Sequence, residues 1–340
     1  MPERLNSLDL YAAMGPHRRK QGANMAYFGT TSTGETVEKI TLTAGNLSVA
    51  ILTWGAVIQS VRLTQIPHDL TLGSDTLADY EGPLRYHGSI IAPVVNRLTD
   101  AAAPLNAETL HFQVNFNGLH TLHSGDAGTH LKVWNILHHS QTECLLGLTL
   151  FHNEGGFPGT RRITALFQAT APASLRLTIT TTTDADTLVN ATNHSYWNLD
   201  GTADFTGHTL QIKADHYLPA NEDFIPTGEI RPTTGMFDFH SAKPVAPHSP
   251  DLDDCFCLSQ TQQPLRDVLR LTGQSGTEMT VATTEPGIQI YDCRHDDYKG
   301  LAIEAQGWPD APNKPGFPPI TLARGQSLSQ ITEWRFTSVS

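Results

Sequence analysis

The chain is poor in charge, and most of the charge it has is of one sign. Only 16% of its 340 residues are charged, with 34 acidic side chains against 22 basic ones and a formal net charge of −12. Nucleic acid and anionic membranes are poor partners for such a surface. No apolar run approaches the length of a membrane span. We therefore expect no nucleic acid and no membrane as partner, and phosphorylated substrates would need a local cluster of Arg or Lys.

Cysteine is scarce as well. The four cysteines are Cys144, Cys255, Cys257 and Cys293, and no two of them form a C-x-x-C motif. On a strand, Cys255 and Cys257 would lie side by side on one face, as a redox pair would. We favour the other interpretation, in which the cysteines are small buried apolar residues in a reducing compartment.

The N-terminal segment lacks the features of a signal peptide. Acidic residues stand near its start, and LDLYAAM is too short and too mixed for a signal core. The basic HRRKQ segment and a second methionine, Met25, indicate a loosely ordered extension over residues 1–25. A single domain is expected to follow over residues 26–338, and a cytoplasmic location is the default.

Long helical patterns are also missing, since no convincing amphipathic helix exceeds two turns. Alternating runs rich in β-branched residues occur instead, at residues 47–63, 174–183, 208–218 and 278–284. Turn sequences such as NFNGLH and NEGGFPGT separate them, in a chain with 27 Gly and 21 Pro. Strands that recur without intervening helices argue against parallel βαβ folds. We predict an all-β chain that forms one large antiparallel β-sandwich.

The stretch NATNHSYWNLDG, Asn190–Gly201, is too polar for an ordinary core strand. On a strand, its side chains would alternate between two faces, with His194, Tyr196 and Asn198 on one and Asn193, Ser195 and Trp197 on the other. Each face combines polar groups with an aromatic ring, which suits a sugar-binding surface. A core histidine bonded to neighbouring amides fits equally well, and this stretch alone leaves both interpretations open.

Two other segments place a charged residue at the edge or in the middle of an apolar run. Glu304 stands inside the predicted strand LAIEA, and a Glu is rarely buried without a partner. GSIIAPVVNRLTD ends its apolar run at Asn96 and Arg97, and the Arg fork suits a carboxylate or sugar hydroxyls. An exposed edge Glu and a solvated Arg are the alternatives. The Pro-rich WPDAPNKPGFPP that follows Glu304 cannot be a regular strand, so we expect a rigid loop that walls a cleft.

Histidine and aspartate clusters raise the question of a metal site. NGLHTLHSGDAGTHLKVWN carries His120 and His123 at H-x-x-H spacing, with His130 downstream. That spacing favours zinc on a helix or tight turn, but here it lies in a Gly-rich loop without a nearby Cys. We expect instead one His presented at the mouth of a cleft. Asp253 and Asp254 precede a strand-like CFCL, where a polar turn is the alternative to a site.

Together these segments resemble the aldose 1-epimerases, also called galactose mutarotases, over residues 36–336. NATNHSYWNLDG is similar to the family's N-x-T-N-H-S-Y-F-N-L, and IEAQGWPDAPNKPGFPP is similar to its L-E-T-Q-x-x-P-D-A-x-N. These two motifs are very specific in combination. LTLGSDTLADYEG, FIPTGEI, GMFDFH and EPGIQIY are further family-like segments, and the order of the motifs is kept.

The resemblance implies a galactose mutarotase-like supersandwich with a sugar cleft on one concave face. The family's general acid falls on His194 and its general base on Glu304. Its substrate-binding residues fall on Asn96, Arg97, His123, Asp253 and Gln289. The implied enzyme interconverts the α and β anomers of free hexoses such as glucose and galactose. It needs no cofactor and no metal, and we expect a monomer or homodimer whose partner is the small-molecule sugar.

The sequence departs from the family pattern at Pro93, Ser124, Asp254 and Glu285, and none of these positions is an inferred catalytic group. They leave the sugar preference open, and Asp254 adds an acid that we expect beside the site. The alternatives are a hexose 6-phosphate epimerase and a non-catalytic sugar-binding protein of the same fold. Reference pKa values put Glu304 in its ionised form near neutrality. We expect Glu304 and Asp253 to keep a proton on His194.

Overall fold

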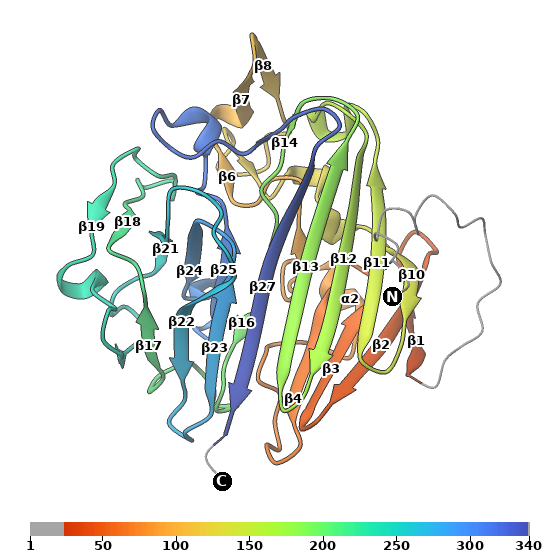
Figure 1. The fold of residues 1–340 in the computed structure, drawn as a ribbon, viewed down its shortest axis with the longest axis vertical. Coiled ribbons are helices and arrows are strands. Elements are labelled where there is room, and N and C mark those ends of the chain that lie inside the picture. Colours follow the sequence, from red (N-terminus) through yellow and green to blue (C-terminus); the bar gives the residue numbers. More distant parts are fainter. Residues whose placement is uncertain (1–23, 339–340) are drawn as a thin grey trace, which may run out of the picture.

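The computed structural model describes residues 24–338, which fold almost entirely as β-strands in two packed layers (Figure 1). All the strand pairs of its sheets are antiparallel, so the predicted antiparallel β-sandwich is confirmed. The described residues hold one short α-helix, α2 (Leu77–Glu81). No helix among them is long and apolar enough to cross a lipid bilayer.

One layer is a nine-stranded sheet, which crosses the front of the molecule in Figure 1. Its strands follow the order β10 (Asn135–His139), β11 (Glu143–Leu150), β12 (Arg161–Thr170), β13 (Ser174–Thr183), β27 (Ser327–Thr337), β23 (Glu278–Thr283), β22 (Arg266–Thr272), β17 (Thr209–Ile212) and β20 (Lys243–Pro244). The C-terminal strand β27 lies in its middle, so both ends of the chain's sequence contribute to one continuous core.

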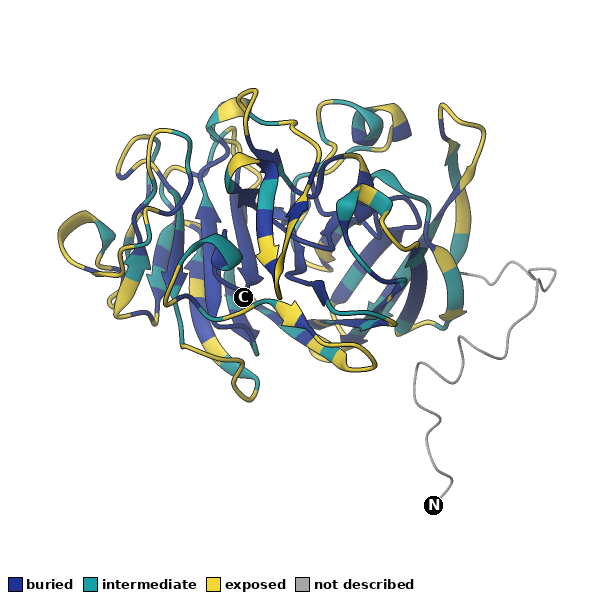
Figure 2. Cartoon of the chain, turned by 90° about the horizontal axis from the view of Figure 1, so that it is seen from above, coloured by how far each residue is buried: buried dark blue, intermediate teal, exposed yellow. Residues whose placement is uncertain are grey.

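The other layer consists of two sheets side by side behind the first. The four-stranded sheet contains β1 (Met25–Thr30), β2 (Thr36–Ala44), β3 (Leu47–Leu52) and β4 (Ile58–Leu63). The six-stranded sheet follows the order β16 (Tyr196–Trp197), β25 (Leu301–Gln306), β24 (Gly287–Tyr291), β21 (Asp253–Cys257), β18 (His216–Leu218) and β19 (Arg231–Pro232). One apolar core joins both sheets to the nine-stranded sheet, and the strands are mostly buried (Figure 2).

Short strand pairs and turns make up the rest of the described chain. Two-residue and four-residue strand pairs are β5 (Ile90–Ile91) with β15 (Thr192–Asn193), β6 (Arg97–Leu98) with β9 (Thr121–Leu122), β7 (Ala102–Leu105) with β8 (Glu108–His111), and β14 (Thr187–Leu188) with β26 (Thr321–Leu322). The 3₁₀ turns are η1 (Thr99–Ala101), η2 (Gly125–Ala127), η3 (Thr129–Leu131), η4 (Glu154–Gly156), η5 (Gly235–Phe237), η6 (Arg294–Asp296) and η7 (Ala311–Asn313).

All four alternating runs form strands, but two of the runs each contain two strands and not one. Residues 174–183 are strand β13, and residues 278–283 are strand β23. Residues 47–63 form the hairpin β3–β4, because Gly55 at φ +61° and Ala56 at φ 49° turn the chain back. Residues 208–218 are shared between β17 and β18, which belong to different sheets. Alternation therefore locates strands but does not show where one ends and the next begins.

The expected N-terminal extension lies mostly outside the described residues. Of residues 1–25, the structure describes Asn24 and Met25, and Met25 opens strand β1. The side-chain amide of Asn24 (Nδ2) donates to the backbone carbonyl of Ser140 at 2.5 Å. Nothing in the structure bears on the rest of the predicted extension, which lies outside the described residues.

The two faces of the six-stranded sheet differ in polarity, and this difference positions the functional groups. Register places Asp253 opposite Tyr291 and Gln289 opposite Glu304, all on the face turned away from the nine-stranded sheet. Tyr196 joins this face through the pairing of β16 with β25. The opposite face is apolar and enters the main core through Phe256, Ile288, Ile290 and Ile303.

Candidate active site

A cavity of about 390 Å³ opens over the polar face of the six-stranded sheet. Six of the seven residues proposed from the sequence line it: Asn96, Arg97, His123, His194, Asp253 and Glu304. They come from five separate parts of the chain, and the volume is in the range of small-molecule sites. The seventh residue, Gln289, does not line the cavity and lies behind Asp253.

His194 and Glu304 meet inside this cavity. The Nε2 atom of His194 lies 3.5 Å from the Oε1 atom of Glu304, and both side chains are about 95% buried or more. Glu304 stands in the middle of β25, while His194 lies in the bend between β15 and β16. Backbone bonds fix that bend, because the amide of His194 donates to the carbonyl of Ser89 at 2.9 Å. Asn190–Gly201 is therefore a bent segment and not the single strand considered above.

Several buried polar atoms of the cavity residues have no hydrogen-bond partner. They are Nδ1 of His194, Oε2 of Glu304 and Nε of Arg97. A buried polar atom without a partner costs about 1–3 kcal/mol, and proteins rarely keep such atoms without a reason. Donors and acceptors that converge on one cavity suit a ligand with several hydroxyl groups, which can both donate and accept.

The pKa values of the pair contradict the expectation that neighbouring carboxylates keep a proton on His194. Burial raises the pKa of Glu304 well above its usual 4.5, and Asp253 adds to the rise. Burial, with a smaller contribution from His87, lowers the pKa of His194 to about 3. Desolvation outweighs the attraction across 3.5 Å. In the free protein, burial therefore favours the neutral pair, with its one proton on Glu304.

Arg97 and Asp253 form a buried ion pair on the cavity wall. Nη2 of Arg97 lies 3.2 Å from Oδ2 of Asp253, and Nε2 of Gln289 donates to Oδ1 of Asp253 at 2.8 Å. The guanidinium also packs on the rings of Phe116 and Phe224, with its carbon 4.7 and 5.1 Å from their centroids. Both oxygens of Asp253 are thereby held, so the wall presents a fixed set of donors and acceptors.

Two hydrogen bonds join Asn96 and His123. The amide of Asn96 donates to Nδ1 of His123 at 3.1 Å, and the amide of His123 donates to the carbonyl of Asn96 at 2.9 Å. Both residues have a left-handed backbone, with φ 63° and 53°. Burial lowers the pKa of His123, so its ring is neutral. Because Nδ1 accepts, the hydrogen sits on Nε2 and gives the cavity a donor.

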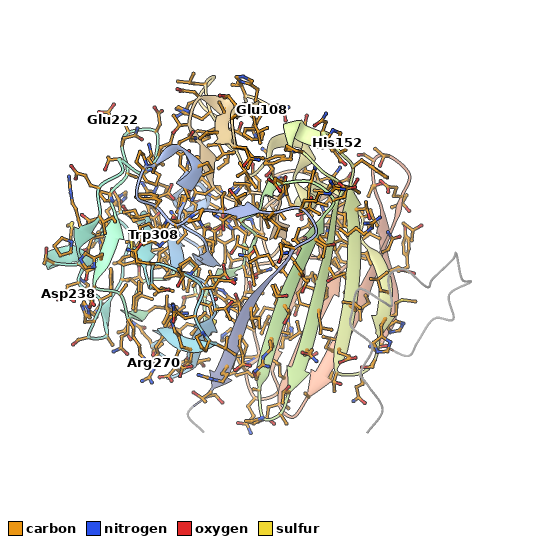
Figure 3. All side chains as sticks on the ribbon, turned by 45° about the horizontal axis from the view of Figure 1, so that its top comes forward. Glu108, His152, Glu222, Asp238, Arg270 and Trp308 are labelled. Atoms are coloured by element: carbon orange, nitrogen blue, oxygen red, sulfur yellow. The ribbon has the colours of Figure 1, made fainter. Side chains whose placement is uncertain are left out.

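The Pro-rich loop after Glu304 does not wall the cavity, contrary to the sequence-based expectation. None of residues 307–319 lines it. Trp308 is 1% exposed and lies within the body in Figure 3, unlike Glu222 and Asp238 at the edge. Asp310 instead binds the start of η1, accepting from the amide of Thr99 at 3.0 Å. Since Thr99 follows β6 directly, the loop supports the strand that carries Arg97.

Asp254 does not add charge to the cleft, which corrects a second expectation. Successive residues of a strand point to opposite faces, so Asp254 shares the core face with its partner Ile290 and not the cavity face of Asp253. Burial raises the pKa of Asp254 to about 7, so the acid is partly neutral at physiological pH. This departure from the family pattern therefore lies outside the cavity.

The two histidines of the H-x-x-H sequence have different hydrogen-bond partners. His123 faces the cavity, whereas His120 accepts at Nδ1 from the amide of Asp100 at 3.0 Å. Nε2 of His120 lies 3.5 Å from a carboxylate oxygen of Asp223. The two imidazoles therefore serve different neighbours.

The cavity is also lined by residues that the sequence analysis did not include among the proposed site residues. They are the aromatic residues Tyr86, Phe116, Tyr196, Phe224 and Tyr291, together with Leu122, Arg294 and His295. Phe224 and Tyr291 lie in the family-like segments FIPTGEI and EPGIQIY, so the sequence motifs could have indicated them. Tyr86 and the turn η6, which carries Arg294 and His295, have no periodic or motif signal. The order of the strands alone brings η6 to the cavity.

A larger cavity of about 490 Å³ lies over the outer side of β2, β3 and β4. In its lining, Arg62 pairs with Asp69 at 2.6 Å, and the side-chain amide of Gln59 donates to Asp75 at 3.1 Å. None of its lining side chains has a buried polar atom without a partner. This cavity therefore lacks the unsatisfied groups that mark the smaller one as the functional site.

The chain is similar in sequence to known proteins over most of its length. The family model described as aldose 1-epimerase matches residues 38–335. The galactose mutarotase of Mus musculus is 30% identical over 334 residues, covering 90% of this chain and 96% of the mouse protein. The human galactose mutarotase is 30% identical over 339 residues, covering 92% and 98%. The aldose 1-epimerase of Escherichia coli is 29% identical, covering 85% and 91%.

Solved structures show the same architecture. A GalM/aldose epimerase homologue from C. elegans superposes with a TM-score of 0.82 at 27% identity, covering 89% of this chain and 99% of that protein. A galactose 1-epimerase from Lactobacillus acidophilus gives a TM-score of 0.81 at 22% identity, covering 93% and 99%, and shows the fold. The family model spans nearly all the described residues, and the chain belongs to the aldose 1-epimerase family.

Proposed function

We propose that the chain interconverts the α and β anomers of free aldohexoses, with glucose and galactose as the first candidates, by opening and reclosing the pyranose ring. Membership of the aldose 1-epimerase family makes the protein a carbohydrate isomerase. The catalytic residues and the sugar substrate are what we propose here. The observation that carries it is the buried pair of His194 and Glu304, 3.5 Å apart in a cavity with polar walls.

Ring opening needs a base and an acid at two neighbouring oxygens. In the proposed step, ionised Glu304 takes the proton from O1 while protonated His194 gives a proton to O5. The C1–O5 bond breaks and O1 becomes the aldehyde oxygen. Rotation about C1–C2 presents the other face of the carbonyl, and the same transfers run backwards to close the ring. Each transfer requires the side chain within about 2.6–3.2 Å of its oxygen.

One proton shared by the pair suffices for the whole cycle. Before opening, it lies on His194. After opening, it lies on Glu304, and reclosure returns it. The neutral pair favoured by burial is therefore the state after ring opening. A sugar whose O1 donates to Glu304 and whose O5 accepts from His194 stabilises the ionised pair, because hydrogen bonds to a charged form favour that form.

Polarimetry on freshly dissolved α-D-glucose and α-D-galactose tests the function directly. We expect a faster approach to the anomeric equilibrium with at least one of the two sugars. Mutarotation is slow but measurable in water, so acid and base help of about 10²–10⁴-fold is the right scale. Sugar binding by calorimetry without any acceleration would indicate a binding protein of the same fold.

The charge balance of the cavity favours a neutral sugar over a hexose 6-phosphate. A phosphate group would need a cluster of cationic side chains, and the cavity lining contains two arginines, Arg97 and Arg294. Arg294 is already bound by Asp292, whose Oδ1 lies 2.8 Å from the arginine's Nε. Arg97 is likewise held by Asp253. With each cation compensated, we expect slower turnover of glucose 6-phosphate than of glucose.

A cytoplasmic location also stays a proposal. Its support is the state of the cysteines, since all four are free in the structure. Cys144, Cys255 and Cys293 are buried and Cys257 is half-buried, as expected for small apolar residues. Free cysteines are the ordinary condition of proteins in a reducing compartment.

The rate is expected to stay nearly constant from neutral to mildly acidic pH. His194 takes up the second proton of the pair only toward its lowered pKa of about 3, so the one-proton state persists well below the ordinary histidine value of 6.5. kcat/KM, corrected for the uncatalysed rate, should show no step near pH 6.5. A tenfold fall between about pH 7 and pH 5 would contradict this assignment.

Arg97→Ala is expected to raise KM about 10- to 100-fold with a smaller effect on kcat, because a charged hydrogen bond to the bound sugar is lost while the reacting pair stays intact. Removing the cation also strands Asp253, so the double variant Arg97→Ala/Asp253→Asn serves to separate binding from stability. Arg62→Ala, a surface arginine paired with Asp69, is the matched control. A large loss of kcat at unchanged KM would overturn the binding role.

A further inference from the structure

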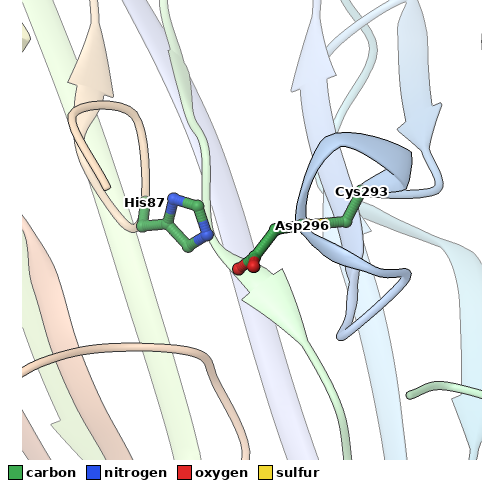
Figure 4. Close-up of side chains that lie close together, drawn as sticks. All are labelled: His87, Cys293 and Asp296. Atoms are coloured by element: carbon green, nitrogen blue, oxygen red, sulfur yellow. The ribbon is translucent and has the colours of Figure 1, made fainter. Parts of the chain in front are cut away.

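We propose that His87, Cys293 and Asp296 form a binding site for one divalent transition-metal ion, with Zn²⁺ as the first candidate. The site goes beyond the sugar chemistry and does not depend on it. The possible ligand atoms are a ring nitrogen, the Sγ atom and a carboxylate oxygen, and all lie within 4.8 Å of one another. Figure 4 shows the His87 ring facing the Asp296 carboxylate, with Cys293 on the same turn as Asp296.

His87 is the observation that points to a ligand. Its side chain is 2% exposed, yet neither ring nitrogen has a hydrogen-bond partner. A buried imidazole with both nitrogens unsatisfied is costly, and an ion or ordered group must offset that cost. Burial lowers the pKa of His87 to about 4, so the ring is neutral at pH 7. A neutral ring has a nitrogen lone pair ready for coordination.

The donor set favours zinc among the common ions. One nitrogen, one sulfur and one carboxylate oxygen suit Zn²⁺, whereas Mg²⁺ and Ca²⁺ select oxygen ligands. Bonds of about 2.0–2.3 Å place the ligands of a tetrahedral zinc roughly 3.4–3.8 Å apart, so the present group must close by about 1 Å. The three residues lie on two short segments, one before β5 and one after β24, which need only a small movement to do so.

Two features of the protein compete with the metal. Nζ of Lys299 lies 2.6 Å from Oδ1 of Asp296, which leaves the second carboxylate oxygen for coordination. Burial raises the pKa of the Cys293 thiol to about 12, so an ion must displace the thiol proton. Both effects weaken binding without blocking it. They also provide a way to change the affinity by mutation.

The position of the site links it to the sugar cavity. The His87 ring stacks on Tyr196 with centroids 4.1 Å apart, and Tyr196 lines the cavity. Asp296 belongs to η6, the turn that also carries Arg294 and His295 into the cavity wall. An ion that joins η6 to His87 would fix this wall. We therefore expect metal binding to stabilise the fold and to lower KM for the sugar by a few fold.

Titration calorimetry with Zn²⁺ on chelator-treated protein, followed by Co²⁺ absorption spectroscopy, tests the site. We expect one ion per chain, a higher melting temperature, and a thiolate-to-cobalt charge-transfer band. Cys293→Ser should abolish the band and weaken Zn²⁺ binding by more than about 10-fold. Cys257→Ser, a half-buried cysteine outside the group, should keep both. No saturable Zn²⁺ binding to the wild type, or a band that survives in Cys293→Ser, would overturn the proposal.

Lys299→Ala provides a test in the opposite direction. If Asp296 is a ligand, removing its competing ion pair should tighten Zn²⁺ binding by about 2- to 5-fold. His87→Gln should weaken Zn²⁺ binding and reduce the rise in melting temperature that Zn²⁺ causes. Unchanged Zn²⁺ affinity in both variants would place the bound ion elsewhere and reject this site.

Discussion

Glu304→Gln is expected to lose roughly 10²–10⁴ of kcat and to keep its fold. Gln has the size of Glu and can still donate or accept hydrogen bonds at the cavity, but it cannot take the proton from O1. Sugar binding should therefore survive, with KM changed by only a few fold. Polarimetry at saturating sugar measures kcat against the uncatalysed rate, and calorimetry measures the remaining affinity.

Stability separates loss of the base from loss of the fold. Because burial raises the pKa of Glu304 in the folded protein, the folded chain binds this proton more tightly than the unfolded chain does. The group therefore costs stability as pH rises above about 4.5. Gln cannot ionise, so the melting temperature of the variant at pH 8 should equal or exceed that of the wild type. The difference should shrink as pH falls toward 4.5.

Glu285→Gln is the matched control for this variant. Glu285 is another buried glutamate whose pKa burial raises, but it lies outside the sugar cavity. There it accepts from the side-chain amides of Gln262 and Gln330. The control should retain the wild-type rate. A near-normal rate for Glu304→Gln, or an equal loss in Glu285→Gln, would reject Glu304 as the base.

The sequence predicts the fold well because strand alternation reports burial directly. β13 and β23 coincide with alternating runs, and the short apolar LAIEA is the core of β25. Alternation also implies that Glu304 and Ile303 face opposite sides. It cannot supply register, because nothing in one strand states which neighbour it pairs with. The pairing of Gln289 with Glu304 is a property of the assembled sheet.

The cavity is predictable only where a residue type is unusual for its surroundings. An acid inside LAIEA and a histidine inside NATNHSYWNLDG stand out, and both reach the cavity. Arg294 and His295 lie in an ordinary polar turn, which tertiary structure alone brings to the site. The protonation of the pair was also beyond the sequence. Burial, which lowers the pKa of His194, cannot be inferred from neighbouring charges that would raise it.

His194→Asn is expected to reduce kcat by roughly 10²–10⁴, because Asn can donate a hydrogen bond to O5 but cannot deliver its proton. The pKa of His194 is lowered in the folded protein, so the unfolded chain binds more protons between pH 6.5 and about 3. The wild type therefore loses folding stability as the pH falls through that window. His194→Asn should lose less folding stability than the wild type over this pH range, and acid titration of both proteins measures the difference and shows that the variant is folded.

His130→Asn is the matched control. His130 is another buried histidine whose pKa is lowered, but it does not line the cavity, so the variant should retain most of the rate.

The double variant His194→Asn/Glu304→Gln tests whether the two groups act on one shared proton. If they do, losing either partner already stops the transfer, and removing the second should cost little more. The double variant should then react within about tenfold of the slower single variant, instead of at the product of the two losses. Polarimetry on all four proteins completes the cycle. Multiplicative losses would mean that each group acts alone, and the contact between His194 and Glu304 across 3.5 Å would then have no part in catalysis.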